Sequence, residues 1–118
     1  EAGQLTLEDE AFDPIEGAWS PLPAMPTRRA LGAAAAVGHR LVVAGGFGWQ
    51  GLPLSSVECY DASGKLWSEL PPLPMCRSGC SMANLRGRVY VLGGLSASGR
   101  HLSRVDCLLL NSSWQPVA

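Results

Sequence analysis

The chain lacks the features that would direct it to nucleic acid, to a membrane or out of the cell. Charged residues make up only 16% of its 118 residues, nine of them basic and ten acidic, so no field of one sign is expected. The longest apolar runs, 33–37 and 41–44, are far shorter than the roughly 20 residues of a membrane helix. The sequence has no charged start followed by an apolar stretch, the pattern of a signal peptide, so none is expected.

Residues that usually carry catalysis or bind metals are also scarce. The chain has two His, two Tyr and four Cys. Cys76 and Cys80 lie four residues apart, but no second pair or nearby His completes a zinc site. No nucleophile elbow or phosphate-binding loop is present. We therefore expect no enzymatic activity, no cofactor and no metal ion. The low cysteine content favours a reducing, cytoplasmic location over a disulfide-stabilised secreted domain.

Glycine and proline, by contrast, are abundant, and they recur with a fixed spacing. Fourteen Gly and nine Pro indicate many short strands joined by turns. Shifting the chain by 48 residues aligns it with itself. The aligned pairs are Phe12 with Tyr60, Trp19 with Trp67, Pro26 with Pro74, Arg29 with Arg77, Gly45-Gly46 with Gly93-Gly94, and Cys59 with Cys107. The last repeat is one residue shorter, so Trp114 follows Trp67 by 47.

Each period contains four strand-like runs separated by turn residues. Connections of a few residues between such runs favour an antiparallel meander. The first full period predicts strands over 31–37, 40–44, 56–60 and 66–70. The second predicts strands over 79–85, 88–92, 103–109 and 113–115, and a partial unit precedes them over 5–13 and 18–21.

The recurring residues resemble the kelch repeat family from about Leu5 onward. The matching pattern is Met25-Pro26, Arg29, Gly45-Gly46, Tyr60-Asp61 and Trp67, recurring as Pro74, Arg77, Gly93-Gly94 and Trp114. Leu108-Leu109 replace Tyr-Asp in the last repeat. The resemblance implies an all-β, kelch-type β-propeller segment of about two and a half four-stranded blades, forming an incomplete ring. Its parts would be residues 1–24, the outer strands of a partial blade, and two kelch repeats over 25–72 and 73–118.

A complete propeller normally has four to eight blades, so we expect the chain to be part of a larger protein. Assembly of several copies into one ring is the alternative. A WD-type propeller is the rival fold, and the missing Trp-Asp dipeptide and the glycine pairs argue against it.

Several recurring residues have a structural explanation. The glycine pairs would end the second strand of each blade, where a Cβ at Gly45 or Gly93 is expected to meet the neighbouring blade. Trp67 and Trp114 would pack between adjacent blades from the outermost strand. Cys59 and Cys107 are expected to be buried free thiols.

By resemblance, one face of the disc is built from the loops after the glycine pairs, 47–54 and 95–102, and from the inter-blade loops 22–30 and 71–78. The candidate partner-binding residues there are Arg29, Arg77, Trp49, Gln50, Ser98, Arg100 and His101. An Arg in the central pocket can grip a carboxylate or phosphate, or it can bond to loop carbonyls structurally. Trp49, opposite Ala97 in the repeat, would anchor an interface or pack over its own loop. His39 is expected to be solvated at the opposite end.

The resemblance implies a protein–protein interaction module that presents substrates to a cullin-based ubiquitin ligase through a BTB domain elsewhere. An actin-binding scaffold and a kelch-type oxidase or sugar-acting enzyme are the alternatives. The expected partners are a protein or peptide with acidic groups and the remaining blades of the propeller, and neither nucleic acid nor a membrane.

Overall fold

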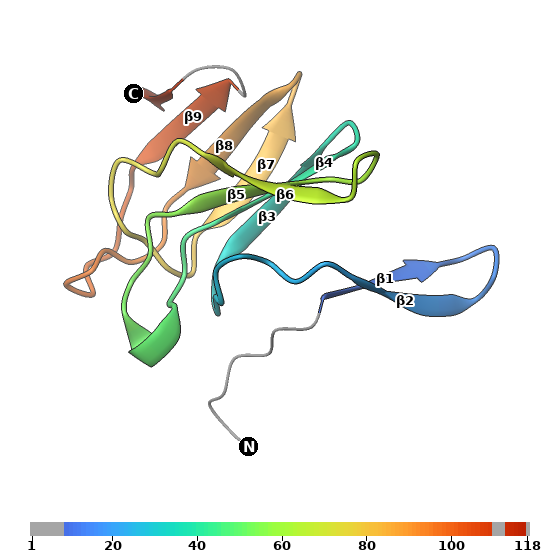
Figure 1. Cartoon of the computed structure of the whole chain (residues 1–118). Helices are drawn as coiled ribbons and strands as arrows, with labels where there is room; N and C mark the ends of the chain where they lie inside the picture. Colours follow the sequence, from blue (N-terminus) through green and yellow to red (C-terminus); the bar gives the residue numbers. More distant parts are fainter. Residues whose placement is uncertain (1–8, 110–112, 118) are drawn as a thin grey trace.

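The computed structural model describes residues 9–109 and 113–117, and these residues form three antiparallel sheets (Figure 1). The two-stranded sheet consists of β1 (Asp9–Asp13) and β2 (Ala18–Leu22). The first four-stranded sheet consists of β3 (Ala33–Val37), β4 (Arg40–Ala44), β5 (Val57–Asp61) and β6 (Leu66–Leu70). The second consists of β7 (Ser81–Leu85), β8 (Arg88–Leu92), β9 (Val105–Leu109) and β10 (Trp114–Val117). A short 3₁₀ turn, η1 (Trp49–Gly51), lies between β4 and β5.

Each four-stranded sheet is a meander in which consecutive strands pair. This confirms the predicted all-β segment with two full blades and the outer half of a third. The strands at 40–44, 66–70 and 88–92 have the predicted bounds. The two innermost strands begin two residues later than predicted, at Ala33 and Ser81. Leu31 and Gly79 adopt left-handed φ values of 58° and 62°, which do not fit an extended strand.

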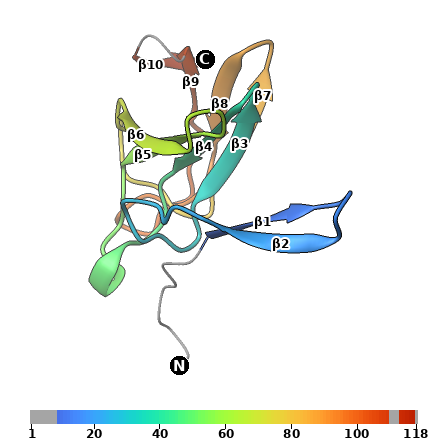
Figure 2. The ribbon, with the colours of Figure 1, turned by 45° about the vertical axis from the view of Figure 1, so that its right-hand side comes forward.

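The two four-stranded sheets meet at their innermost strands. Among the described strands, contacts between the sheets are limited to β3 with β7 and β8, while the outer strands diverge (Figure 2). A sandwich would bring whole faces together instead. The arrangement is therefore the radial packing of neighbouring propeller blades. Buried residues from both blades fill the wedge between them: Val42, Ala44, Val57 and Cys59 from the first, Val89, Val91, Leu108 and Trp114 from the second, and Leu73 from the connecting loop.

The glycine pair after β4 allows the second blade to approach the first. The Gly46 amide donates to the carbonyl of Arg77 in the second blade at 2.8 Å. A Cβ at Gly45 would lie 2.5 Å from that same carbonyl oxygen. At Gly93 a Cβ would be 3.4 Å from its nearest neighbour, Leu102, which is an ordinary contact. The described residues contain no blade after the second, so the contact expected between Gly93 and a following blade stays a prediction.

Tryptophan joins the blades at their outer edge. The Trp114 indole nitrogen donates to the Pro71 carbonyl at 2.8 Å, and Trp67 donates in the same way to Pro23 at 2.8 Å. Trp114 is 8% exposed and belongs to the core between the blades. The two bonds occupy equivalent places in successive repeats. Each ties the outermost strand of one blade to the chain just after the outermost strand of the preceding blade, and we call this recurring junction the seam.

The β1–β2 hairpin repeats the outer half of a full blade. Phe12 pairs with Trp19 at 5.1 Å between ring centres, as Tyr60 does with Trp67 at 5.2 Å. The hairpin projects away from both four-stranded sheets (Figure 1), and Trp19 is 66% exposed.

Asp61 closes the turn after β5 by accepting the Ser63 amide at 2.9 Å. Asp13 does the same after β1, accepting the Ile15 amide at 2.8 Å. The corresponding turn after Leu109 lies outside the described residues.

Candidate functional site

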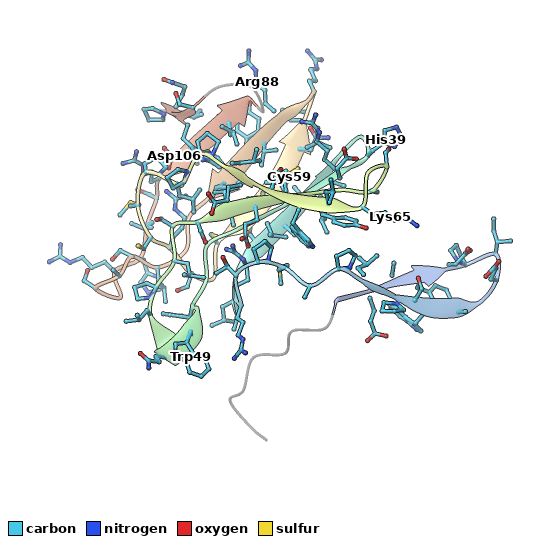
Figure 3. The ribbon with its side chains drawn as sticks, viewed as in Figure 1. His39, Trp49, Cys59, Lys65, Arg88 and Asp106 are labelled. Carbon is cyan, nitrogen blue, oxygen red and sulfur yellow. The ribbon has the colours of Figure 1, made fainter. Side chains whose placement is uncertain are left out.

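Four loops gather at one end of the two full blades, and we call them the loop face: residues 22–32, 45–56, 71–80 and 93–104. They precede or follow the inner strands at the same end of each sheet, since the strands alternate in direction. Figure 3 places Trp49 at this end, away from His39, Lys65 and Arg88. His39 is exposed in the β3–β4 turn at the opposite end, as expected.

The loop face separates the charges that the sequence shows as balanced. Its residues include five of the nine basic side chains and one of the two His, but none of the ten acidic residues. The basic residues are Arg28, Arg29, Arg77, Arg100 and Arg104, with His101 beside them. Folding therefore creates a cationic end on a chain whose net charge is −1.

Arg29 is committed to its own blade. Its Nη2 forms an ion pair with Glu58 Oε1 at 2.8 Å, and its Nη1 donates to the carbonyls of Gly45 and Ser56 at 2.9 and 3.2 Å. The Arg29 and Glu58 side chains are 4% and 2% exposed. Thr27 Oγ1 donates to the other carboxylate oxygen of Glu58 at 2.9 Å. The pair fixes the loop before β3 onto β5.

Arg77 makes the equivalent contacts in the second blade. Its Nη2 lies 2.7 Å from Asp106 Oδ2 and its Nη1 donates to the Val91 carbonyl at 3.3 Å, with both side chains fully buried. Arg104, 41% exposed, shares the same carboxylate at 2.8 Å. The hydrogen bond from Arg104 to Asp106, with their charge attraction, raises the pKa of the Arg104 guanidinium above its usual range. Two cations on one carboxylate leave a net positive charge near the surface.

Both arginines thus have the geometry of the structural alternative, although only Arg29 bonds to loop carbonyls; Arg77 bonds to the carbonyl of Val91 within β8. To grip a partner's carboxylate, Arg29 would have to leave the buried Glu58 without a counter-charge, and Arg77 would have to leave its buried pair with Asp106, which would keep only Arg104. Breaking a buried ion pair in this way is unfavourable. Sequence reasoning missed the two carboxylates. The sequence did contain one signal. Each carboxylate follows its arginine by 29 residues, and the two carboxylates occupy equivalent positions of the repeat.

Trp49 stands on the surface with 65% of its area exposed. The Arg28 guanidinium carbon lies 5.0 Å from the centre of its ring, a cation–π contact worth about 0.5–1 kcal/mol at an exposed site. Gln50, also exposed, has a left-handed φ of 63° that shapes the tight η1 turn. The Gly48 amide closes this loop by donating to Leu52 at 2.8 Å. The loop therefore presents Trp49 outward.

The equivalent loop of the second blade presents cations in place of the tryptophan. Ser96 holds it together: its amide donates to the Arg100 carbonyl at 2.9 Å, and its hydroxyl oxygen accepts the Arg100 amide at 3.2 Å. Ser98 shares a hydrogen bond with the Ser96 hydroxyl at 3.0 Å. Arg100 and His101 are exposed, and their side chains form no ion pair within the described residues.

Two open hollows lie on the loop face at equivalent positions of the repeat. The first hollow, of about 610 Å³, is lined by Pro26, Thr27, Arg28, Gly48, Trp49, Leu52 and Leu54. The second hollow, of about 580 Å³, is lined by Met75, Cys76, Ser96, Ala97, Ser98, Arg100, His101 and Leu102. The structure thus brings Trp49 into one hollow and Ser98, Arg100 and His101 into the other, while Arg29, Gln50 and Arg77 line neither.

The thiols show a simple division by burial. Cys59, Cys80 and Cys107 are buried and Cys76 is partly exposed, all four free. Burial raises the pKa of the Cys59 and Cys80 thiols above their ordinary value. Within residues 9–109 and 113–117, no three His, Cys, Asp or Glu side chains gather as metal ligands. The same residues include no helix long and apolar enough to cross a membrane.

Comparison with known proteins gives two findings. A sequence model of the Kelch motif matches residues 28–74 and again 76–118. Human Kelch-like protein 34 is 44% identical over 57 residues, which are 48% of this chain and 9% of that protein. The chain therefore spans only a small part of the length of this relative.

Proposed function

Because this chain belongs to the kelch-motif family, we propose that it is a protein-interaction module that binds its partner through the loop face. The observation that carries the proposal is the composition of that face. It exposes Trp49, Arg100 and His101 on loops held by rigid blades, and no carboxylate occurs among its residues. Exposed aromatic and Arg side chains are the residues that most often dominate protein interfaces.

The wider role of the module is a further part of the proposal. The resemblance to adaptor proteins supports the presentation of a bound protein to a cullin-based ubiquitin ligase by other domains of the complete protein. The four free thiols support a reducing, cytoplasmic location. Co-purification of a cullin with the complete protein, and reduced turnover of its partner when the loop face is altered, are the expected results.

Proximity labelling in cells with the complete protein tests the interaction itself. The loop-face variant Trp49→Ala/Arg100→Ala changes two exposed side chains, and His39→Ala/Arg88→Ala changes two exposed side chains at the other end. We expect the first variant to lose its labelled partners by at least about tenfold, given interface energies above about 1.4 kcal/mol. The second should retain them. Equal labelling by both variants and the wild type would overturn the proposal.

A further inference from the structure

We propose that the two hollows together bind one extended peptide segment, with a bulky apolar side chain in the first hollow and a carboxylate in the second. The inference rests on the proposed function and specifies its ligand. It starts from the repeat, because the two hollows occupy the same place in successive blades and have similar volumes, about 610 and 580 Å³. Because the backbone around the two hollows is equivalent, any difference in what they bind must come from the side chains that line them.

The first hollow is apolar with an aromatic wall. Trp49 and Leu52 are 65% and 62% exposed, and Leu54 and Pro26 add apolar lining beside Thr27, Arg28 and Gly48. The Arg28 guanidinium lies over the Trp49 ring, 5.0 Å from its centre, and helps to hold the indole at the wall of this hollow. Covering this exposed apolar area with a partner's apolar side chain removes it from water and so contributes favourably to the free energy of binding.

The second hollow carries polar and cationic side chains at its rim, while Met75, Ala97 and Leu102 keep part of its lining apolar. A shift of 48 residues places Ala97 at the position of Trp49, Arg100 at that of Leu52 and His101 at that of Pro53. Arg100 and His101 are exposed there, with Ser96 and Ser98 beside them. Such a hollow offers charge-assisted donors to a carboxylate.

Charge complementarity identifies the ligand as acidic. The loop face contains no Asp or Glu, and its buried arginines are already balanced by Glu58 and Asp106. Arg100 is not balanced in this way, and Arg104 shares a carboxylate that Arg77 already uses. Arg100 therefore gives the second hollow unbalanced positive charge. In the first hollow Arg28 also forms no ion pair within the described residues, but it lies over the ring of Trp49, and Trp49 and Leu52 are the most exposed apolar side chains there. A peptide that carries both groups matches the pair of hollows.

One segment can reach both hollows because their loops are neighbours. Figures 1 and 2 both show η1 next to the loop between β8 and β9, at the same end of the blades. A strand-like peptide advances about 3.3 Å per residue, so a short spacer between the apolar and acidic residues is enough to span adjacent loops.

The test uses an array of fluorescent 12-residue peptides with one Leu or Trp and a Glu pair, placed two to six residues apart. Matched peptides replace Glu with Gln or the apolar residue with Ser. Binding to the full chain is measured by anisotropy. We expect each replacement to weaken binding about tenfold or more, since a hydrogen bond to a charged group or a buried apolar anchor contributes about 1.4 kcal/mol or more.

Two exchange variants assign each peptide group to its hollow. Arg100→Leu places the first hollow's residue in the second and should remove the preference for Glu over Gln while keeping that for the apolar residue. Trp49→Ala should do the reverse. Both positions are exposed, so the melting temperature should stay that of the wild type.

Occupancy of the second hollow can also be followed in the unaltered chain. Cys76 lines it and is the partly exposed thiol among four. The acidic peptide should slow alkylation of Cys76 by iodoacetamide severalfold, and its Gln counterpart should not.

Equal binding of the Glu and Gln peptides, or an unchanged Glu preference in Arg100→Leu, would refute the inference. So would tighter binding of a single-stranded oligonucleotide that displaces the peptides. If no peptide binds but Trp49→Ala/Arg100→Ala still loses its labelled partners in the complete protein, the two-hollow inference fails and the interaction module stands. If those partners are kept as well, both fail.

Discussion

Replacing Gly45 with alanine tests the seam between the two blades. The new Cβ would lie 2.5 Å from the Arg77 carbonyl oxygen, a contact that real Cβ atoms do not make. Relieving it costs about 1–3 kcal/mol of overpacking and endangers the Gly46–Arg77 hydrogen bond, worth about 1 kcal/mol. The left-handed φ of 68° adds about 1 kcal/mol for any non-glycine residue. We expect Gly45→Ala to lower the unfolding free energy by about 3–5 kcal/mol.

Gly93→Ala is the matched control, because Gly93 has the same place in the repeat and a similar φ of 64°. Its Cβ would make only an ordinary 3.4 Å contact, so the expected loss is the backbone strain of about 1 kcal/mol. Urea unfolding of the full chain, followed by tryptophan fluorescence, measures both. If the two losses agree within about 0.5 kcal/mol, the argument that the second blade crowds Gly45 is refuted.

Three further predictions follow from the buried groups. Asp106→Asn removes the counter-charge of the fully buried Arg77 and should cost about 3–5 kcal/mol in the same urea experiment; a loss near zero would contradict the ion-pair argument. Trp114→Ala should cost about 3–5 kcal/mol, while Trp19→Ala, at a position 66% exposed, should cost less than about 1 kcal/mol; similar losses would argue against a tryptophan seam. Burial raises the pKa of the Cys80 thiol, so its contribution to stability is complete below the ordinary thiol pKa of about 8.5 and is lost as pH rises through the raised value. The unfolding free energy of Cys80→Ala, measured in urea at pH 8–10.5, should therefore fall less steeply with pH than that of the wild type. Equal slopes would contradict this.

The repeat made most of the fold predictable. Gly45-Gly46 and Gly93-Gly94 mark the ends of β4 and β8, and β4, β6 and β8 begin and end where the strand-like runs between turn residues indicated. The starts of β3 and β7 were less predictable, because the left-handed φ of Leu31 has no signature in its side chain. The division of the chain at residues 24 and 72 stays a prediction.

The site was less predictable because its chemistry depends on contacts between residues distant in sequence. The sequence around the arginine is the same whether its side chain faces a pocket or a buried acid. Only the structure shows that Glu58 and Asp106 lie against Arg29 and Arg77. Likewise, a balanced count of charges hides their separation in space, since β-strands that alternate in direction send successive loops to opposite ends. Trp49 was identified because the repeat does not require a tryptophan there.

The seam described above joins unlike surfaces, and this has a consequence for assembly. One blade contributes the Gly46 amide and the Pro71 carbonyl, and the next contributes the Arg77 carbonyl and the Trp114 indole. Because the join is head-to-tail, two copies that face each other through the same surface cannot form it. The donors and acceptors at both ends are all paired only when the blades close into a ring, so that the last blade meets the first. Stability should therefore rise stepwise with each added blade, in proportion to the number of joins.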